Sequence, residues 1–224
     1  MRDVAGRSYR LIFGTAYLIL MTSALVLVVT LPFLAVLMTT DPRASWPWLV
    51  LTAPMLAPAV QAAFGVFSAH AADGSPDVIR VFARTWWRGL ARTITVGAAG
   101  SIVVTALIAD VILIWGHRAG ALLIPVLVSA VLLVAITIPV ILAALAEDPG
   151  LPLGPLARAS VWLAVRRWYL GLLSVAALVV LAQIVIERPA WGLGVVLAPA
   201  LYLLWGNARA ALRPVLSPTT SRTR

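Results

Sequence analysis

Residues 75–115 read SPDVIRVFARTWWRGLARTITVGAAGSIVVTALIADVILIW. The first half of this stretch carries a basic residue at every fourth position: Arg80, Arg84, Arg88 and Arg92. The second half, Thr93–Trp115, contains no basic residue. A helix needs about 20 apolar residues to cross the hydrocarbon core of a bilayer, and this half is long enough. The stretch therefore predicts a basic helix at a membrane surface that leads into a membrane span.

The whole chain has the composition of a membrane protein. Of its 224 residues, 62% are hydrophobic and 11% are charged, whereas soluble domains are close to half apolar and a quarter charged. Apolar runs of span length occur at about 16–38, 46–71, 93–115, 120–146, 169–186 and 190–206. We therefore expect an all-α polytopic integral membrane protein, with residues 1–206 forming a single domain of six transmembrane helices.

The distribution of basic residues predicts the orientation of these spans. All 17 basic residues are arginines, and only Arg43, Arg118 and Arg188 lie at the junctions after the first, third and fifth spans. The rest lie at the chain ends and at the other two junctions, so the positive-inside rule predicts that both termini are cytoplasmic. The nine tryptophans fall near the expected span ends, where indole is favoured. The net charge of +9 belongs to these membrane-flanking segments, and we expect no nucleic-acid partner.

Two cytoplasmic connections have the pattern of amphipathic helices. We expect interfacial helices at about 76–92 and 155–168. The first begins with Ser75 as an N-cap, followed by Pro76 at the first helical position and Asp77 in the first turn. The second carries arginines at 158, 166 and 167. We expect residues 207–224 to form a basic, disordered cytoplasmic tail.

The helix at 76–92 presents a candidate surface for lipid or partner docking, made of Arg80, Arg84, Trp86, Trp87, Arg88 and Arg92. Two interpretations stay open at this stage. The arginines and tryptophans can orient the protein and anchor it to lipid phosphates, or they can form a rigid basic platform for a cytoplasmic partner.

Three polar residues lie within predicted spans and form a candidate polar membrane cluster. Asp110 is the one carboxylate inside a predicted span, and an acid at that location is a functional hypothesis by default; the alternative is that it reaches the outer headgroups or pairs with Arg118. Gln183 is predicted at a similar outer depth and could share a polar cluster with Asp110. Gln61 is predicted in the middle of the second span, where an amide either joins two helices or contacts a substrate.

Other patterns argue against catalysis. The chain has no cysteine, no zinc-binding H-E-x-x-H helix, no phosphate-binding glycine loop and no G-x-S-x-G elbow. The two histidines, His70 and His117, are predicted at opposite membrane faces and cannot share a metal. We expect a non-enzymatic protein without a metal site or cofactor. Gly97 and Gly100 are interpreted as a small-residue face for close helix packing.

Part of the chain resembles the YesL-like membrane proteins of Gram-positive bacteria, a family of unknown function. The segments that carry the resemblance are Thr52-Ala53-Pro54, Pro58–Phe64, the acidic turn at Asp73 and Asp77, and Val78–Leu90 with its Trp86-Trp87-Arg88. The family pattern has glycine where this chain has Ala57. The resemblance implies a protein of the bacterial plasma membrane and an accessory role beside carbohydrate ABC importers, with a permease or ATPase as partner. It brings no catalytic residues.

Two functions follow as hypotheses. The first is an accessory component of carbohydrate ABC-type uptake; the permease role itself is disfavoured, because the loop at 147–155 lacks the pattern of an ATPase-coupling loop. The second is a small-molecule binder or carrier that acts on its own. A polar pocket at the membrane midplane would distinguish them, and the residues available for one are Gln61, Ser101, Ser129, Thr137 and Ser174.

Overall fold

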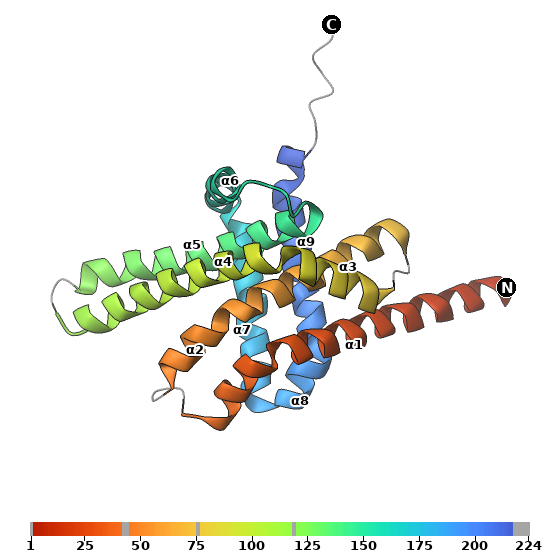
Figure 1. The fold of residues 1–224 in the computed structure, drawn as a ribbon, viewed down its shortest axis with the longest axis horizontal. Coiled ribbons are helices and arrows are strands. Elements are labelled where there is room, and N and C mark those ends of the chain that lie inside the picture. The colour runs from red at the N-terminus through yellow and green to blue at the C-terminus, as the bar shows by residue number, and fades with distance from the viewer. Residues whose placement is uncertain (1, 42–44, 75–76, 118–119, 217–224) are drawn as a thin grey trace, which may run out of the picture.

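The structure is a computed structural model that describes residues 2–41, 45–74, 77–117 and 120–216. Every regular element in these ranges is helical (Figure 1). Six helical segments are long and apolar enough to cross a membrane: Gly14–Thr39, Trp46–Ala72, Val78–Ile114, Leu122–Glu147, Trp168–Glu187 and Pro189–Leu212. The prediction of an all-α fold with six spans is therefore confirmed.

The helices follow one another with short connections. Their bounds are α1 (Arg2–Thr39), α2 (Trp46–Thr52), a 3-10 turn (Ala53–Met55), α3 (Leu56–Asp73), α4 (Val78–Ile114), α5 (Gly120–Glu147), α6 (Leu153–Arg166), α7 (Trp168–Glu187), α8 (Pro189–Trp191), a π turn (Gly192–Val196) and α9 (Leu197–Leu216). The 3-10 turn between α2 and α3 coincides with Pro54 and precedes Pro58, which each remove a backbone donor. The second span is consequently two helices joined by a tight turn.

The predicted boundary between an interfacial helix and the third span is wrong. Residues 78–114 form one uninterrupted helix of 37 residues, because no proline interrupts this stretch. At 1.5 Å per residue α4 is about 55 Å long, far longer than a bilayer core. Its N-cap is Asp77, whose carboxylate accepts from the backbone N–H of Arg80 at 3.2 Å, and not Ser75, which lies outside the described residues.

The predicted tail also needs correction. Helix α9 continues to Leu216, so residues 207–216 are helical, and within the predicted tail only 217–224 lie outside the described residues. The reason is burial: Ala208, Ala211 and Leu212 are at most 5% exposed against the bundle. Residues 2–15 are likewise helical, as the first part of α1. The second helix that was predicted as interfacial corresponds to α6, which ends at Arg166, two residues before the predicted end.

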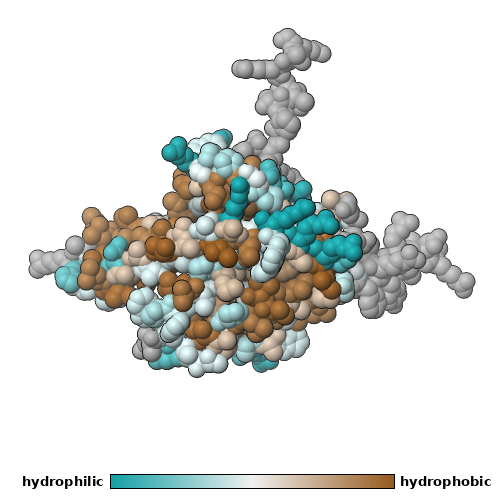
Figure 2. Space-filling model, viewed as in Figure 1, coloured by the Kyte–Doolittle hydropathy of each residue, from teal (hydrophilic) through white to brown (hydrophobic). Residues whose placement is uncertain are grey.

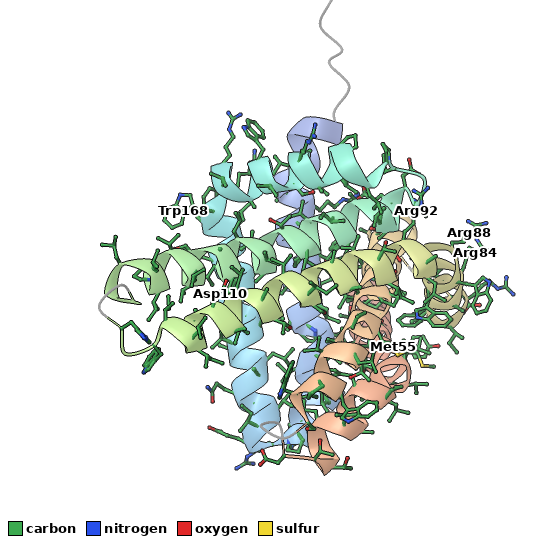
Figure 3. The ribbon with its side chains drawn as sticks, turned by 60° about the vertical axis from the view of Figure 1, so that its left-hand side comes forward. Met55, Arg84, Arg88, Arg92, Asp110 and Trp168 are labelled. Carbon is green, nitrogen blue, oxygen red and sulfur yellow. The ribbon has the colours of Figure 1, made fainter. Side chains whose placement is uncertain are left out.

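The helices do not form one parallel bundle. Helices α4 and α5 lie side by side and run across α7 and α9 at a steep angle, as both ribbon views show (Figures 1 and 3). Helix α3 packs antiparallel to the N-terminal part of α4, with Gly65 facing Thr85 and Gly97 facing Pro54. A Cβ atom at Gly97 would lie only 2.8 Å from the Pro54 carbonyl oxygen. The interpretation of Gly97 as a close-packing residue is therefore confirmed.

Large apolar side chains cover much of the outside. Leu113 is 75% exposed, Leu122 is 80% exposed and Ile186 is 76% exposed, and hydrophobic residues occupy broad areas of the surface in Figure 2. A soluble monomer rarely exposes apolar patches of this size. In lipid such side chains are in their preferred solvent, so the surface agrees with a membrane-embedded protein.

Candidate functional site

The exposed centre of the arginine surface is Arg84, Trp87 and Arg88. Both arginines point away from the body of the protein in Figure 3, and within the described ranges neither makes a hydrogen bond or an ion pair. Trp87 is 73% exposed. Figure 2 shows hydrophilic residues gathered on the near face beside hydrophobic areas. These three side chains are therefore free to contact another molecule.

The flanking arginines of this surface already have internal partners. Arg80 pairs with Asp77 at 3.7 Å, with both side chains largely exposed. Arg92 donates from Nη1 to the carbonyl oxygens of Pro149 at 2.6 Å and Leu151 at 2.9 Å. Arg92 thus holds the loop between α5 and α6. The predicted six-residue surface divides into a free part at Arg84 and Arg88 and a structural part at Arg92.

Trp86 differs from its neighbour Trp87. It packs against the hydrophobic core, and its ring lies 5.7 Å from that of Trp87. Its Nε1 atom is buried and finds no acceptor among the described residues. Trp86 therefore fixes the position of this part of α4, and Trp87 is the member of the pair that is available for contact.

Gln61 is a buried helix-to-helix contact. Its side chain is 0% exposed, and Nε2 donates to the carbonyl oxygen of Leu145 at 2.9 Å. In a regular helix, the carbonyl oxygen of Leu145 would accept a hydrogen bond from the backbone N–H of residue 149. That residue is Pro149, which has no N–H. The amide of Gln61 therefore takes the place of a backbone donor that the sequence lacks. Of the two readings that the sequence left open, the structure favours the contact between helices.

Gln61 lies near the middle of the second apolar segment, Trp46–Ala72, and its amide contacts two neighbouring helices. Its amide lies against Gly89, where a methyl group would collide with it, and against Leu145, two residues before the acidic end of α5 at Glu147. Gly89 lies between Arg88 and Arg92. The amide of Gln61 therefore lies between α4 and the C-terminal turn of α5. The packing of α3 on α4 brings these groups together, and the apolar run alone does not reveal which helices meet.

The structure does not gather the three candidate polar residues. Asp110 and Gln183 are both exposed, and no interaction joins them within the described part of the chain. Asp110 lies 21 residues beyond Gly89 on the same helix, which is about 31 Å along its axis. Gln61 and Asp110 are therefore far apart. The other expected partner, Arg118, lies outside the described residues.

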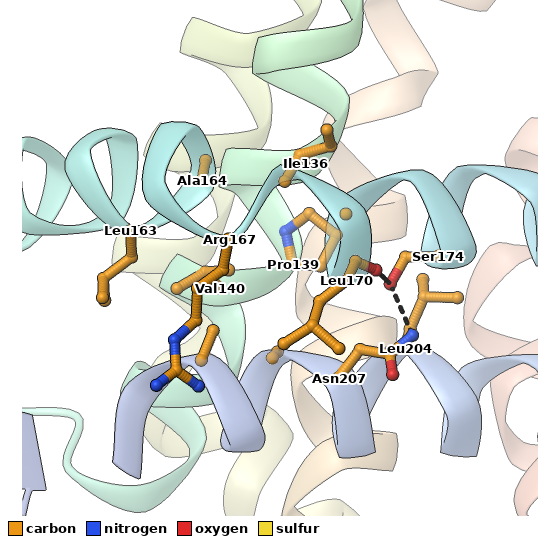
Figure 4. Close-up of a pocket in the computed structure, with 13 residues that line it drawn as sticks. Ile136, Pro139, Val140, Leu163, Ala164, Arg167, Leu170, Ser174, Leu204 and Asn207 are labelled. Atoms are coloured by element: carbon orange, nitrogen blue, oxygen red, sulfur yellow. Dashed lines mark hydrogen bonds between the residues drawn. The ribbon is translucent and has the colours of Figure 1, made fainter. Parts of the chain in front are cut away.

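A second polar cross-link joins α6–α7 to α9. Arg167 donates from Nη1 to the carbonyl oxygen of Ala210 at 2.7 Å, and the residue four positions after Ala210 is Pro214. Beside it, Asn207 donates to Ser174 Oγ at 3.0 Å, which in turn donates to the Leu170 carbonyl at 3.1 Å. Arg167, Leu170, Ser174 and Asn207 line a small pocket of about 20 Å³ (Figure 4), which has room for about one water molecule. Its polar groups serve structure, and it is too small for a solute.

The two cross-links follow one rule. A proline within or just after a helix frees the carbonyl four residues earlier, and in a membrane protein a freed carbonyl must find a partner from a neighbouring element. Gln61 and Arg167 each supply one, from α3 and from the joint between α6 and α7. An ion pair between Arg209 and Glu147 at 3.5 Å adds a further link between α9 and α5. The sequence analysis missed these pairings, because a proline reveals the free carbonyl and not its partner.

A pocket among the spans has mainly apolar walls. This cavity of about 390 Å³ lies between the second span, α4, α5, α7 and α9, and Ser101 and Thr105 are the hydroxyl-bearing residues on its walls. Ser174 lines the small pocket, Thr137 lines a groove beside α6, and Ser129 is exposed. The polar residues expected at a midplane pocket are therefore dispersed. The described residues also contain no cluster of three His, Cys, Asp or Glu side chains that could hold a metal ion.

No family model, curated protein or solved structure matches this chain.

Proposed function

We propose that this chain is a non-enzymatic integral membrane protein of a bacterial plasma membrane that acts by binding a partner complex through Arg84, Trp87 and Arg88. The observation that carries the proposal is that the arginines of α4 differ in whether they have partners within the protein. Arg92 is occupied by the loop after α5, whereas Arg84 and Arg88 are exposed and have no partner among the described residues. Exposed arginine beside exposed tryptophan is the composition of an interaction surface.

The position of this surface supports contact with a cytoplasmic partner. Helix α5 ends at Glu147, close to the level of Gly89 and Arg92. Helix α4 extends from Gly89 back to Val78, a further 11 residues or about 16 Å. This part of α4 is covered by α3 on one side and leaves its arginine side open. A helix that is already ordered loses little conformational entropy when a partner binds, so it is a suitable docking element.

The partner follows from the resemblance to YesL-like proteins. We propose the permease or ATPase of a carbohydrate ABC importer, with this chain as an accessory component whose termini lie in the cytoplasm. The competing interpretation of the same surface is anchoring to lipid phosphates, which needs positive charge but no particular partner.

Co-purification of the tagged protein from its native host in mild detergent, followed by mass spectrometry, tests the proposal. Near-stoichiometric recovery of a permease or its ATPase is expected, and Arg84→Gln with Arg88→Gln should abolish it. Arg166→Gln is the matched control, because Arg166 is also an exposed arginine, stacked on Trp162 at 4.9 Å. Partner recovery that survives the double substitution, together with disturbed membrane orientation, would support lipid anchoring instead.

A second candidate function rests on the central cavity. Its volume of about 390 Å³ falls within the range of ligand pockets, roughly 300–1,000 Å³, and its walls suit an apolar molecule better than a sugar. A binder acting alone should be stabilised against heating by a long-chain fatty acid such as palmitate. Val104→Trp, which fills the cavity, should remove that stabilisation. The absence of any palmitate effect on the unmodified protein would rule this function out.

A further inference from the structure

A groove separates α6 from the hairpin of α4 and α5. Its volume is about 380 Å³, and its walls are Leu153, Ala157 and Val161 of α6, residues 95–103 of α4 and residues 133–141 of α5. Nine residues of helix on each wall give a length of about 12 Å. The groove is therefore long enough to hold part of an acyl chain.

The walls of the groove offer no free hydrogen-bond donor from a hydroxyl group. Thr95 donates to the Arg92 carbonyl at 2.6 Å, and Thr137 donates to the Leu133 carbonyl at 2.7 Å. The other lining residues are apolar or glycine. A polar solute would lose its hydration here without compensation, so the groove favours hydrocarbon.

Positive charge lies at the α6 side of this groove. Arg158 follows Ala157 directly, is exposed, and has no hydrogen bond or ion pair with the residues that the structure describes. It belongs to a shallow depression of α6 formed with Ala157, Val161, Trp162 and Val165, and this depression shares Ala157 and Val161 with the groove. An unpaired arginine is thus continuous with an apolar channel.

Trp162 and Val165 complete an interfacial helix. They are 55% and 60% exposed, and the Arg166 guanidinium lies 4.9 Å from the centre of the Trp162 ring. Exposed tryptophan and arginine on one amphipathic helix are typical of the headgroup region. The level of Arg158 is therefore that at which lipid phosphates occur, and the groove extends from it toward the spans.

We propose that this groove is a binding site for one anionic phospholipid. Its phosphate pairs with Arg158, and one acyl chain passes Ala157 and Val161 and lies between α6 and the hairpin of α4 and α5. The charge of Arg158 selects an anionic headgroup over a zwitterionic one, and the apolar walls select a lipid over free phosphate. The site is separate from Arg84 and Arg88 and does not depend on the proposed partner.

Titration of the delipidated, detergent-purified protein with phosphatidylglycerol, followed by native mass spectrometry, tests this site. Phosphatidylcholine with the same acyl chains should bind more weakly, and inorganic phosphate should not displace the lipid. Arg158→Gln should weaken phosphatidylglycerol binding roughly fivefold, the effect of one arginine near a lipid surface. Arg158→Lys should largely retain the affinity. Arg188→Gln is the control that should leave it unchanged, because Arg188 is an exposed arginine at the end of α7 that lies away from α6.

A second variant tests the acyl part of the site independently of charge. Ala157→Phe fills the groove and leaves Arg158 in place, so it should weaken the binding of both lipids. Equal affinity of the unmodified protein and Arg158→Gln for phosphatidylglycerol would overturn the proposal, as would equal affinity for the two lipids. Displacement by inorganic phosphate would identify a free-phosphate site instead, and unchanged binding by Ala157→Phe would exclude the groove.

Discussion

Replacing Gln61 with leucine removes the donor that satisfies the Leu145 carbonyl. The Nε2–O distance is 2.9 Å, and Pro149 cannot supply an N–H in its place. Leaving a buried acceptor unpaired costs about 1–3 kcal/mol, although hydrogen bonds between membrane helices average about 0.6 kcal/mol and reach about 1.7 kcal/mol. Because this carbonyl has no backbone alternative, we expect its loss to cost about 1–1.7 kcal/mol, near the upper end of the membrane values.

The single substitution does not isolate this cost. The Oε1 atom of Gln61 is itself buried and without a partner among the described residues, so leucine also removes an unfavourable group. A double-mutant cycle with Pro149→Ala separates the two effects. Alanine restores an N–H four residues after Leu145. The free energy gained by removing the buried Oε1 atom is the same with proline or alanine at position 149, so it cancels in the cycle.

The cycle is measured as the free energy of unfolding in mixed micelles, followed by tryptophan fluorescence. Gln61→Leu should cost about 1 kcal/mol more with Pro149 present than with alanine there, a difference of roughly 2–4 °C in melting temperature. Gln183→Leu is the matched control, because its amide is exposed on α7, and it should show no coupling to position 149. An equal cost of Gln61→Leu in both backgrounds, within about 0.3 kcal/mol, would refute the assignment of Gln61 to the proline-freed carbonyl.

Three further predictions follow from the same geometry. Arg167→Gln should destabilise the protein less when Pro214 is replaced by alanine, because the new N–H reaches the Ala210 carbonyl; equal melting-temperature losses in both backgrounds would contradict this. Gly89→Ala should cost about 1–3 kcal/mol by overpacking, because its methyl group meets the Gln61 amide, and Gln61→Ala should restore most of the loss in the same unfolding assay. Asp110→Asn should change the free energy of unfolding by less than about 0.5 kcal/mol, since Asp110 is exposed; a larger loss of stability would reveal a structural role.

The spans could be predicted because lipid imposes a simple length and composition rule. Residues 120–146 and 169–186 were expected as spans, and α5 and α7 occupy them to within one residue at each end. The end of α9 could not be predicted in this way. Its last turns contain arginine and asparagine as well as buried Ala208 and Leu212. The mean hydropathy of this mixed segment is therefore low, although one side of the helix is buried.

The site was harder to predict because its contacts join distant parts of the chain. The sequence identified Arg84, Arg88 and Arg92 as one periodic surface, and periodicity gives all three the same weight. The loop after α5, 57 residues away in sequence, separates Arg92 from the others by occupying its guanidinium. The partners of Gln61 could not be predicted for a related reason, since the register of α3 on α4 depends on Gly89 and Gly97, which an apolar run does not reveal.

The most direct measurement compares two variants of α4 in one experiment: the Arg84→Gln, Arg88→Gln double variant and Arg92→Gln, each scored for partner recovery and melting temperature. The double variant should lose the co-purified partner and keep its melting temperature, because its side chains have no partner in the described structure. Arg92→Gln should retain the partner and melt earlier, because two carbonyls of the α5–α6 loop lose their donor. If both variants lose the partner and melt alike, the division of α4 into a binding part and a structural part is contradicted.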